Sequence, residues 1–136
     1  MFQLVYISTA REPISAPMLG QILLASRRNN AGNDITGLLV AGGRRFLQAL
    51  EGPEQAVLDT YARIKQDSRH YAMVLLTGRS VEARAFGNWA MAYEQGGDAR
   101  NGNDLRATVE ALTSSITDKT LRAHFLGFAE QQSRAA

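Results

Sequence analysis

The sequence predicts an α+β fold in which helices cover both faces of one sheet. Residues 2–8 and 35–41 are apolar at both alternating sets of positions, a pattern typical of strands that are buried on both faces. Apolar side chains also recur at helical spacing in four other stretches, residues 16–30, 53–67, 105–116 and 121–128. A chain of 136 residues is most simply one globular unit, long enough to bury about two-thirds of its unfolded surface.

The first helix is expected to follow the strand at 2–8. Ser15 can cap it by accepting a hydrogen bond from a backbone N–H, and Pro17 suits its first turn, where an N–H has no helical partner. The helix should run to about Asn30. At about 100° per residue, Leu19, Leu23 and Asn30 fall on one side, so Asn30 extends the inward-facing stripe.

A hairpin and a second helix are expected next. The strands 35–41 and 44–51 flank the turn Gly42-Gly43, which favours a hairpin. Gly52-Pro53 then begins a helix that ends near Asp67. A carboxylate at a helix C-terminus opposes the helix dipole by roughly a few tenths of a kcal/mol, so we expect Asp67 to have a specific partner.

Two further strands, residues 71–77 and 89–94, complete the predicted sheet. The order strand, helix, strand, strand, helix, strand is that of the ferredoxin-like βαββαβ arrangement, with both helices on one sheet face. The strand at 89–94 adds a fifth. Two C-terminal helices can cover the other face, in cis or in a dimer, so we divide the chain into a domain at 1–95 and a helical cap at 96–136.

Composition excludes several classes of function. The chain has no cysteine, hence no disulfide or thiolate site, and its two histidines lie in different elements, so no metal site is expected. Neither a signal peptide nor a membrane-spanning stretch is visible, which predicts a cytoplasmic protein. The charge of +2 is scattered, so nucleic-acid binding is not expected.

Glycine-rich phosphate loops and common hydrolase motifs are absent, so we do not expect an enzyme. An acylphosphatase-like hydrolase using Arg11 and Asn33 stays an alternative.

Several polar side chains are predicted to point into the domain. On the strand 44–51, Gln48 shares a face with Phe46 and Leu50. An unpaired buried amide costs about 1–3 kcal/mol, so Gln48 needs a partner inside. The other inward or edge positions are Tyr6, Asn29, Asn30, Arg63 and Asp67. Each alone has a structural explanation. Tyr6 can be a core phenol, and Asn29 and Asn30 can be helix C-terminal amides. Arg63 and Asp67 can form a solvated ion pair. Together they suit a planar heteroaromatic ligand rich in carbonyl and imide groups.

Five segments have the order and approximate spacing of motifs from one known family. They are residues 4–8, 29–30 with 35–39, 46–52, 63–70 and 84–91. In these segments the chain resembles the BLUF domain, the sensors of blue light using FAD, over roughly residues 2–95. The set of motifs is far more specific than any one of them.

The resemblance implies a role for each matching residue. Tyr6 resembles the photoactive tyrosine, and Gln48 resembles the glutamine that bridges it to the flavin ring. Asn30 resembles the asparagine that hydrogen-bonds the carbonyl and imide edge of that ring, with Asn29 beside it. The other cofactor-binding positions implied by the resemblance are Ser8, Arg63, Asp67, Arg69 and His70.

The resemblance also implies a mechanism. Light transiently moves an electron and a proton from Tyr6 by way of Gln48. The amide then rotates or tautomerises, strengthens its hydrogen bond to the flavin and shifts the absorption to the red. Trp89 and Met91 resemble a variable pair that completes the switch. Gln48 is expected beside the last strand, through which the change would reach the C-terminal helices.

The implied cofactor is non-covalent FAD, with FMN or riboflavin as alternatives. The implied partners are the flavin and a separate signalling protein, and the short members of the family often assemble, so a homo-oligomer is expected. The alternative from a different class is a ferredoxin-like ligand-binding or dimerisation module without photochemistry.

Overall fold

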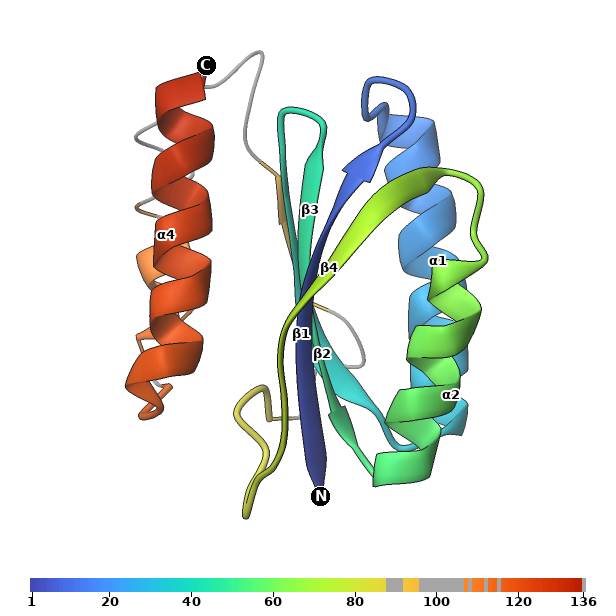
Figure 1. Ribbon diagram of the computed structural model, residues 1–136, viewed down its shortest axis with the longest axis vertical. Helices are drawn as coiled ribbons and strands as arrows, with labels where there is room; N and C mark the ends of the chain where they lie inside the picture. The colour runs from blue at the N-terminus through green and yellow to red at the C-terminus, as the bar shows by residue number, and fades with distance from the viewer. Residues whose placement is uncertain (88–91, 96–106, 108, 112, 115, 136) are drawn as a thin grey trace.

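A five-stranded sheet lies between two helical layers in the computed structural model of the chain (Figure 1). The structure describes all residues except 88–91, 96–106, 108, 112, 115 and 136. Helices α1, Ala16–Gly32, and α2, Glu54–Lys65, cover one face, and α4, Lys119–Ala135, covers the other. Of the helices so described, none is sufficiently long and apolar to span a membrane.

The strands have the ferredoxin-like order with one addition. They are β1, Phe2–Ala10; β2, Thr36–Gly42; β3, Arg45–Gly52; β4, His70–Ser80; and β5, Ala92–Gln95. Their order in the sheet is β4-β1-β3-β2-β5, antiparallel throughout except for the parallel pair of β2 and β5. The predicted fold class, including the fifth strand, is therefore confirmed.

One predicted neighbourhood is wrong. Gln48 was expected beside the last strand, but β2 lies between β3 and β5, and Gln48 pairs with Leu39, which pairs in turn with Tyr93. A parallel fifth strand can only join the sheet at an edge, and β3 already has a neighbour on each side. Trp89 and Met91 lie outside the described residues.

The helix ends follow the expected local chemistry. The Ser15 hydroxyl accepts a hydrogen bond from Met18 N at 3.2 Å, as predicted for the cap of α1. The second helix has Glu54 in its first turn and Arg63 and Lys65 in its last, an arrangement that suits the helix dipole.

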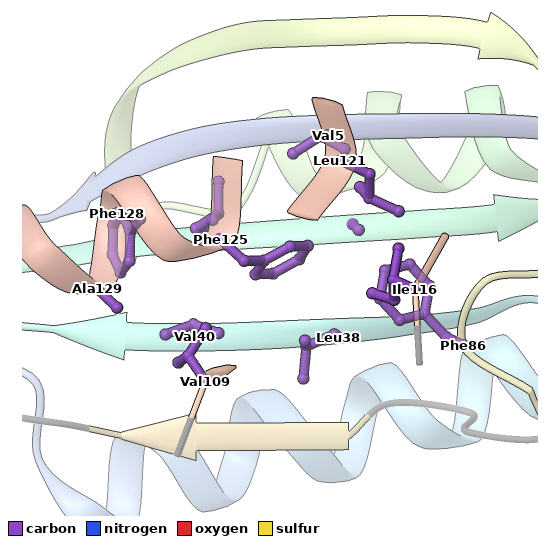
Figure 2. Close-up of a cluster of buried hydrophobic side chains, with 12 residues drawn as sticks. Val5, Leu38, Val40, Phe86, Val109, Ile116, Leu121, Phe125, Phe128 and Ala129 are labelled. Carbon is purple, nitrogen blue, oxygen red and sulfur yellow. The ribbon is translucent and has the colours of Figure 1, made fainter. Parts of the chain in front are cut away.

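Side chains alternate between two apolar cores. Leu4 of β1 packs with Leu19 and Leu39 beneath α1 and α2. On the opposite face, Val5 of β1 belongs to a cluster that includes Phe125 (Figure 2). The cap prediction holds for α4 and for the described residue Val109, which belongs to the same cluster. Both faces of β1, β2 and β3 are thus covered, as their apolar residues require, whereas Val74 and Leu75 of the edge strand β4 are 53 % and 50 % exposed.

Candidate functional site

A cavity of about 690 Å³ opens between α1, α2 and the sheet. Its walls contain apolar side chains, Ile22, Leu39, Phe46, Leu50 and Ile64 among them, and a larger number of polar ones. The polar lining residues are Tyr6, Ser8, Ser26, Arg28, Asn29, Asn30, Gln48, Thr60, Arg63, Gln66, Asp67, Arg69 and His70. The volume lies within the roughly 300–1,000 Å³ that is typical of cofactor and small-molecule sites.

Tyr6 and Gln48 lie next to each other in the cavity's polar wall. They are directly opposite each other on β1 and β3, and each is only 3 % exposed. The Tyr6 hydroxyl donates a hydrogen bond to Gln48 Oε1. The prediction that Gln48 has a partner inside is confirmed, and that partner is a phenol from a neighbouring strand.

The environment of Tyr6 keeps its phenol neutral. Burial raises the pKa of Tyr6 well above its ordinary value, and the nearby Tyr61 and Asp67 raise it further. The Tyr61 ring lies 5.5 Å from the Tyr6 ring at an interplanar angle of 54°. Tyr6 is therefore held as a hydrogen-bond donor whose proton points at the carbonyl end of the Gln48 amide.

An amide network joins α1 to α2 at the rim of the cavity. Asn29 Nδ2 donates to Asn30 Oδ1 and to Thr60 Oγ1, both at 3.2 Å. Asn33 in turn donates to the carbonyl oxygen of Asn29 at 2.7 Å and to its Oδ1 at 3.0 Å. Asn30 is 1 % exposed, and the network orients its side chain within the cavity wall.

Asp67 has the specific partner that its position predicted, although the partner is Arg69 and not Arg63. Arg69 donates to Asp67 from its side chain, with Nη2 2.5 Å from Oδ2, and from its backbone N at 2.9 Å. Hydrogen bonds from Arg69 lower the pKa of Asp67 in spite of its partial burial, and the same pairing raises the pKa of Arg69. This pair fixes the cavity's rim just after α2.

His70 ties three elements together. Its Nε2 lies 2.7 Å from the Ile64 carbonyl oxygen, which can only accept, so Nε2 carries the proton. The other ring nitrogen, Nδ1, is 2.9 Å from Ser8 Oγ and accepts from that hydroxyl when the ring is neutral. The ring thus links the start of β4 to α2 and to β1.

One cavity brings together all nine cofactor-binding positions that the sequence suggested: Tyr6, Ser8, Asn29, Asn30, Gln48, Arg63, Asp67, Arg69 and His70. Trp89 and Met91 are outside the part of the chain that the structure describes. Sequence reasoning missed Thr60, which continues the inward stripe of α2 between Val57 and Ile64, and this spacing could have revealed it.

The residues of the hydrolase alternative lie elsewhere. The Arg11 guanidinium stacks on the Tyr71 ring at 5.1 Å from its centroid, and the Asn33 amide donates to Asn29. Neither residue lines the cavity. The structure therefore provides no phosphate cradle made of these two side chains.

The lining fits a flavin ring. Such a ring is flat and apolar on its faces, and one edge alternates carbonyl, imide N–H and carbonyl. The apolar walls can sandwich the faces, and the amides of Asn30 and Gln48 each carry a donor end and an acceptor end for that edge. The chemistry of the donor set thus agrees with the ligand class that the sequence suggested.

Comparisons with known proteins agree on one family. A family model described as "BLUF: Sensors of blue-light using FAD" matches residues 1–92. The blue light- and temperature-regulated antirepressor BluF of Escherichia coli K12 is 38 % identical over 88 residues, which are 65 % of this chain and 22 % of that protein. The photoactivated adenylate cyclase subunit beta of Euglena gracilis is 39 % identical over 83 residues, 61 % of this chain and 10 % of that protein. The chain spans less than a quarter of the length of these relatives.

Solved structures extend the similarity to nearly the whole chain. The dark-state structure of BlrB, a BLUF protein, superposes with a TM-score of 0.73 at 25 % identity, covering 99 % of this chain and 96 % of that one. The photo-activated state of BlsA superposes with a TM-score of 0.70 at 27 % identity, covering 94 % and 93 %.

Proposed function

This chain belongs to the BLUF family, the sensors of blue light using FAD, and from that premise we propose that FAD binds non-covalently in the cavity between α1 and α2, with its ring against Tyr6 and Gln48. The observation that carries the proposal is the buried hydrogen bond from the Tyr6 hydroxyl to Gln48 Oε1 inside that cavity. A bound flavin supplies blue-light absorption and a strong electron acceptor in its excited state.

The two residues perform the switch. Loss of an electron from Tyr6 makes its phenol acidic, and Gln48 Oε1, already the hydrogen-bond acceptor, takes the proton. When the electron and proton return, the amide is left rotated or tautomerised. An amide suits this step because its two ends differ in hydrogen bonding and are nearly equal in size, whereas Glu and Leu lack that property.

The rest of the cavity holds the cofactor. Asn30 is proposed to bind the carbonyl and imide edge of the ring, with Asn29 and Thr60 fixing its orientation. Arg63 and the Asp67–Arg69 pair are proposed to line the ring or the ribityl-phosphate chain, because they form the outer rim. Ser8 and His70 complete the wall on the β1 side.

The output is proposed to leave through the C-terminal part of the chain. Residues 1–95 act as the sensor and 96–136 as a cap whose docking changes, with Trp89 and Met91 of the last strand as further parts of the switch. The name of one relative describes an antirepressor and that of another a cyclase subunit, which supports an effector that differs between proteins. For this chain we propose a separate signalling partner, a homo-oligomeric state and a cytoplasmic location.

A light-minus-dark spectrum tests the proposal. Protein purified in darkness and loaded with FAD should be yellow, and its flavin absorption should move to the red under blue light and return in the dark. Releasing the pigment from protein isolated without added flavin identifies FAD, FMN or riboflavin. Protein that stays colourless after loading would overturn the proposal, and bound flavin without a spectral shift would favour a ligand-binding module without photochemistry.

A further inference from the structure

Glu51 is a fully buried carboxylate that the proposed photochemistry does not use. It is 0 % exposed and lies on β3 three residues after Gln48, so it faces the opposite side of the sheet. Its oxygens accept hydrogen bonds from Ala85 N at 2.8 Å, from Phe86 N at 2.7 Å and from Thr36 Oγ1 at 3.2 Å. Burying a carboxyl group without hydrogen-bond partners has a large free-energy cost. These contacts therefore hold Glu51 and its partners in one arrangement.

Arg84 adds hydrogen bonds to the region around Glu51. Its guanidinium donates to Thr36 Oγ1 at 2.9 Å, to the Glu51 carbonyl oxygen at 3.3 Å and to the Asp34 carbonyl oxygen at 2.9 Å. The chain is closely packed here, because a Cβ at Gly52 would lie 2.6 Å from the Asp34 carbonyl oxygen. We call Glu51, Thr36, Arg84, Ala85 and Phe86 the Glu51 clamp.

The clamp holds a segment that contacts the cap. Residues 81–87 have no regular secondary structure, so their position depends on these hydrogen bonds and on packing. Phe86 is 2 % exposed, and its ring lies 6.0 Å from the Phe125 ring of α4 at 72°, an edge-to-face contact. Figure 2 shows Phe86 on the α4 side of the sheet, within the cluster that contains Ile116.

We propose that Glu51 is a positioning residue for signal output, which transmits a change at Gln48 along β3, through the amides of Ala85 and Phe86, to Phe125 of α4. The proposal rests on the function proposed above. In this route the change passes from β3 to α4. It does not pass through β2 and β5, which lie between Gln48 and one edge of the sheet. Along a strand, Gln48 and Glu51 are only about 10 Å apart.

Glu51→Gln tests the route with almost no change in size. The glutamine keeps one carbonyl oxygen but places an NH2 donor against a backbone N–H, so one of the two amides loses its acceptor. Since the chain has no cysteine, Ala62→Cys on α2 and Lys119→Cys on α4 can carry a pair of spin labels. The distance between the labels is measured in the dark and after blue light, and the flavin spectrum is recorded on the same samples.

The labelled parent should show the red shift and a light-dependent change in distance. In the Glu51→Gln variant we expect an unchanged red shift, a dark distance centred at the parent value, and a light-dependent change reduced at least about twofold. Glu54→Gln, the same substitution at an exposed site three residues on, should behave as the parent. An unaltered dark distance separates this role from a merely structural one.

Three results would overturn the proposal: a full response of α4 in Glu51→Gln, loss of its red shift together with the response, or a parent that shifts its spectrum without any movement of α4. A parent without a red shift would instead refute the proposed function. If Glu51→Gln does not fold, Phe86→Leu decides, because it keeps the clamp's backbone amides and removes the ring that contacts Phe125. It should then show a normal spectrum with the same reduced response.

Discussion

The two faces of the sheet differ although the same strands build both. On β1, Val5 faces α4 and Tyr6 faces α1 and α2; on β3, Leu47 and Gln48 divide in the same way. The α4 face holds a cluster of buried apolar side chains, with the polar Glu51 buried beside it, whereas the opposite face encloses a cavity of about 690 Å³ with a polar wall. Side-chain alternation with period 2 lets one strand contribute to a packed core and to a ligand site at once.

The side chains on the two faces are expected to have different tasks. The apolar cluster on the α4 face contributes to stability, because its side chains, Phe125 among them, are removed from water. The cavity face leaves space between α1, α2 and the sheet and lines it with polar groups that a ligand can contact. Substitutions in the apolar cluster should therefore act mainly on stability, and substitutions of residues proposed to contact the flavin should act mainly on ligand binding and photochemistry.

The largest effect is expected for substitutions at Tyr6 and Gln48. Tyr6→Phe or Gln48→Leu should retain the flavin, because the apolar walls and Asn30 remain, but should abolish the normal red shift, since each removes one side of the hydrogen bond. The measurement is the light-minus-dark spectrum. Tyr61→Phe is the matched control, because its ring packs on Tyr6 without taking part in that bond. A normal photocycle in Tyr6→Phe or Gln48→Leu would show that the switch lies elsewhere.

The packed face is tested by Phe125→Ala. Phe125 is fully buried against Phe86, so its truncation should lower the free energy of unfolding by about 3–5 kcal/mol. Urea unfolding measures this change, and the red shift should persist in the molecules that remain folded. Leu24→Ala is the control, because Leu24 is 60 % exposed and its loss should cost within about 0.5 kcal/mol. A loss below about 1 kcal/mol for Phe125→Ala would contradict close packing at α4.

A smaller effect on the cavity face is expected at Asn30. Asn30→Ala removes the amide proposed for the ring edge and should weaken flavin binding by about 1–3 kcal/mol, which is roughly 5- to 150-fold in Kd. Titration of the flavin-free protein followed by fluorescence quenching gives the affinity. Gln55→Ala, an exposed amide on α2, should bind as the parent does. An unchanged affinity in Asn30→Ala would rule out that contact.

Much of this contrast could be predicted from the sequence. The strands 2–8 and 35–41 read as buried on both faces, and the stripe Leu19, Leu23, Asn30 placed an amide among inward side chains. These predictions depend only on the spacing of apolar residues along the chain. That spacing matches the folded structure because burial of one side of a strand or helix imposes it. The inward direction of Gln48 followed in the same way.

What depends on distant partners could not be predicted. The two amides that Glu51 binds lie 34 and 35 residues away, in a segment without any periodic pattern. Asp67 was expected to have a partner, but its choice of Arg69 over Arg63 is set by the turn after α2. The position of β5 at the sheet edge depends on which strand offers a partner for parallel pairing, and no local signal contains that information.

The smallest effect, and the last test of the cavity face, is the pH dependence contributed by Asp67. Arg69 lowers the pKa of Asp67 in the folded state below its ordinary value of 3.8, so the pair adds stability above that value and loses it as the pH falls through the lower, folded-state pKa. Because both side chains are about one-third exposed, the contribution should be about 1 kcal/mol or less.

Urea unfolding of the flavin-free parent and of Asp67→Asn, between about pH 3 and pH 7, measures this contribution. The parent should be the more stable near neutral pH, and its advantage should shrink only below about pH 4, where the unfolded chain binds the proton first. Ser68→Ala keeps the Asp67–Arg69 pair and should reproduce the parent's profile. The difference in the free energy of unfolding between the parent and Asp67→Asn could instead stay constant down to the lowest pH. That result would mean that Arg69 does not pair with Asp67 in solution.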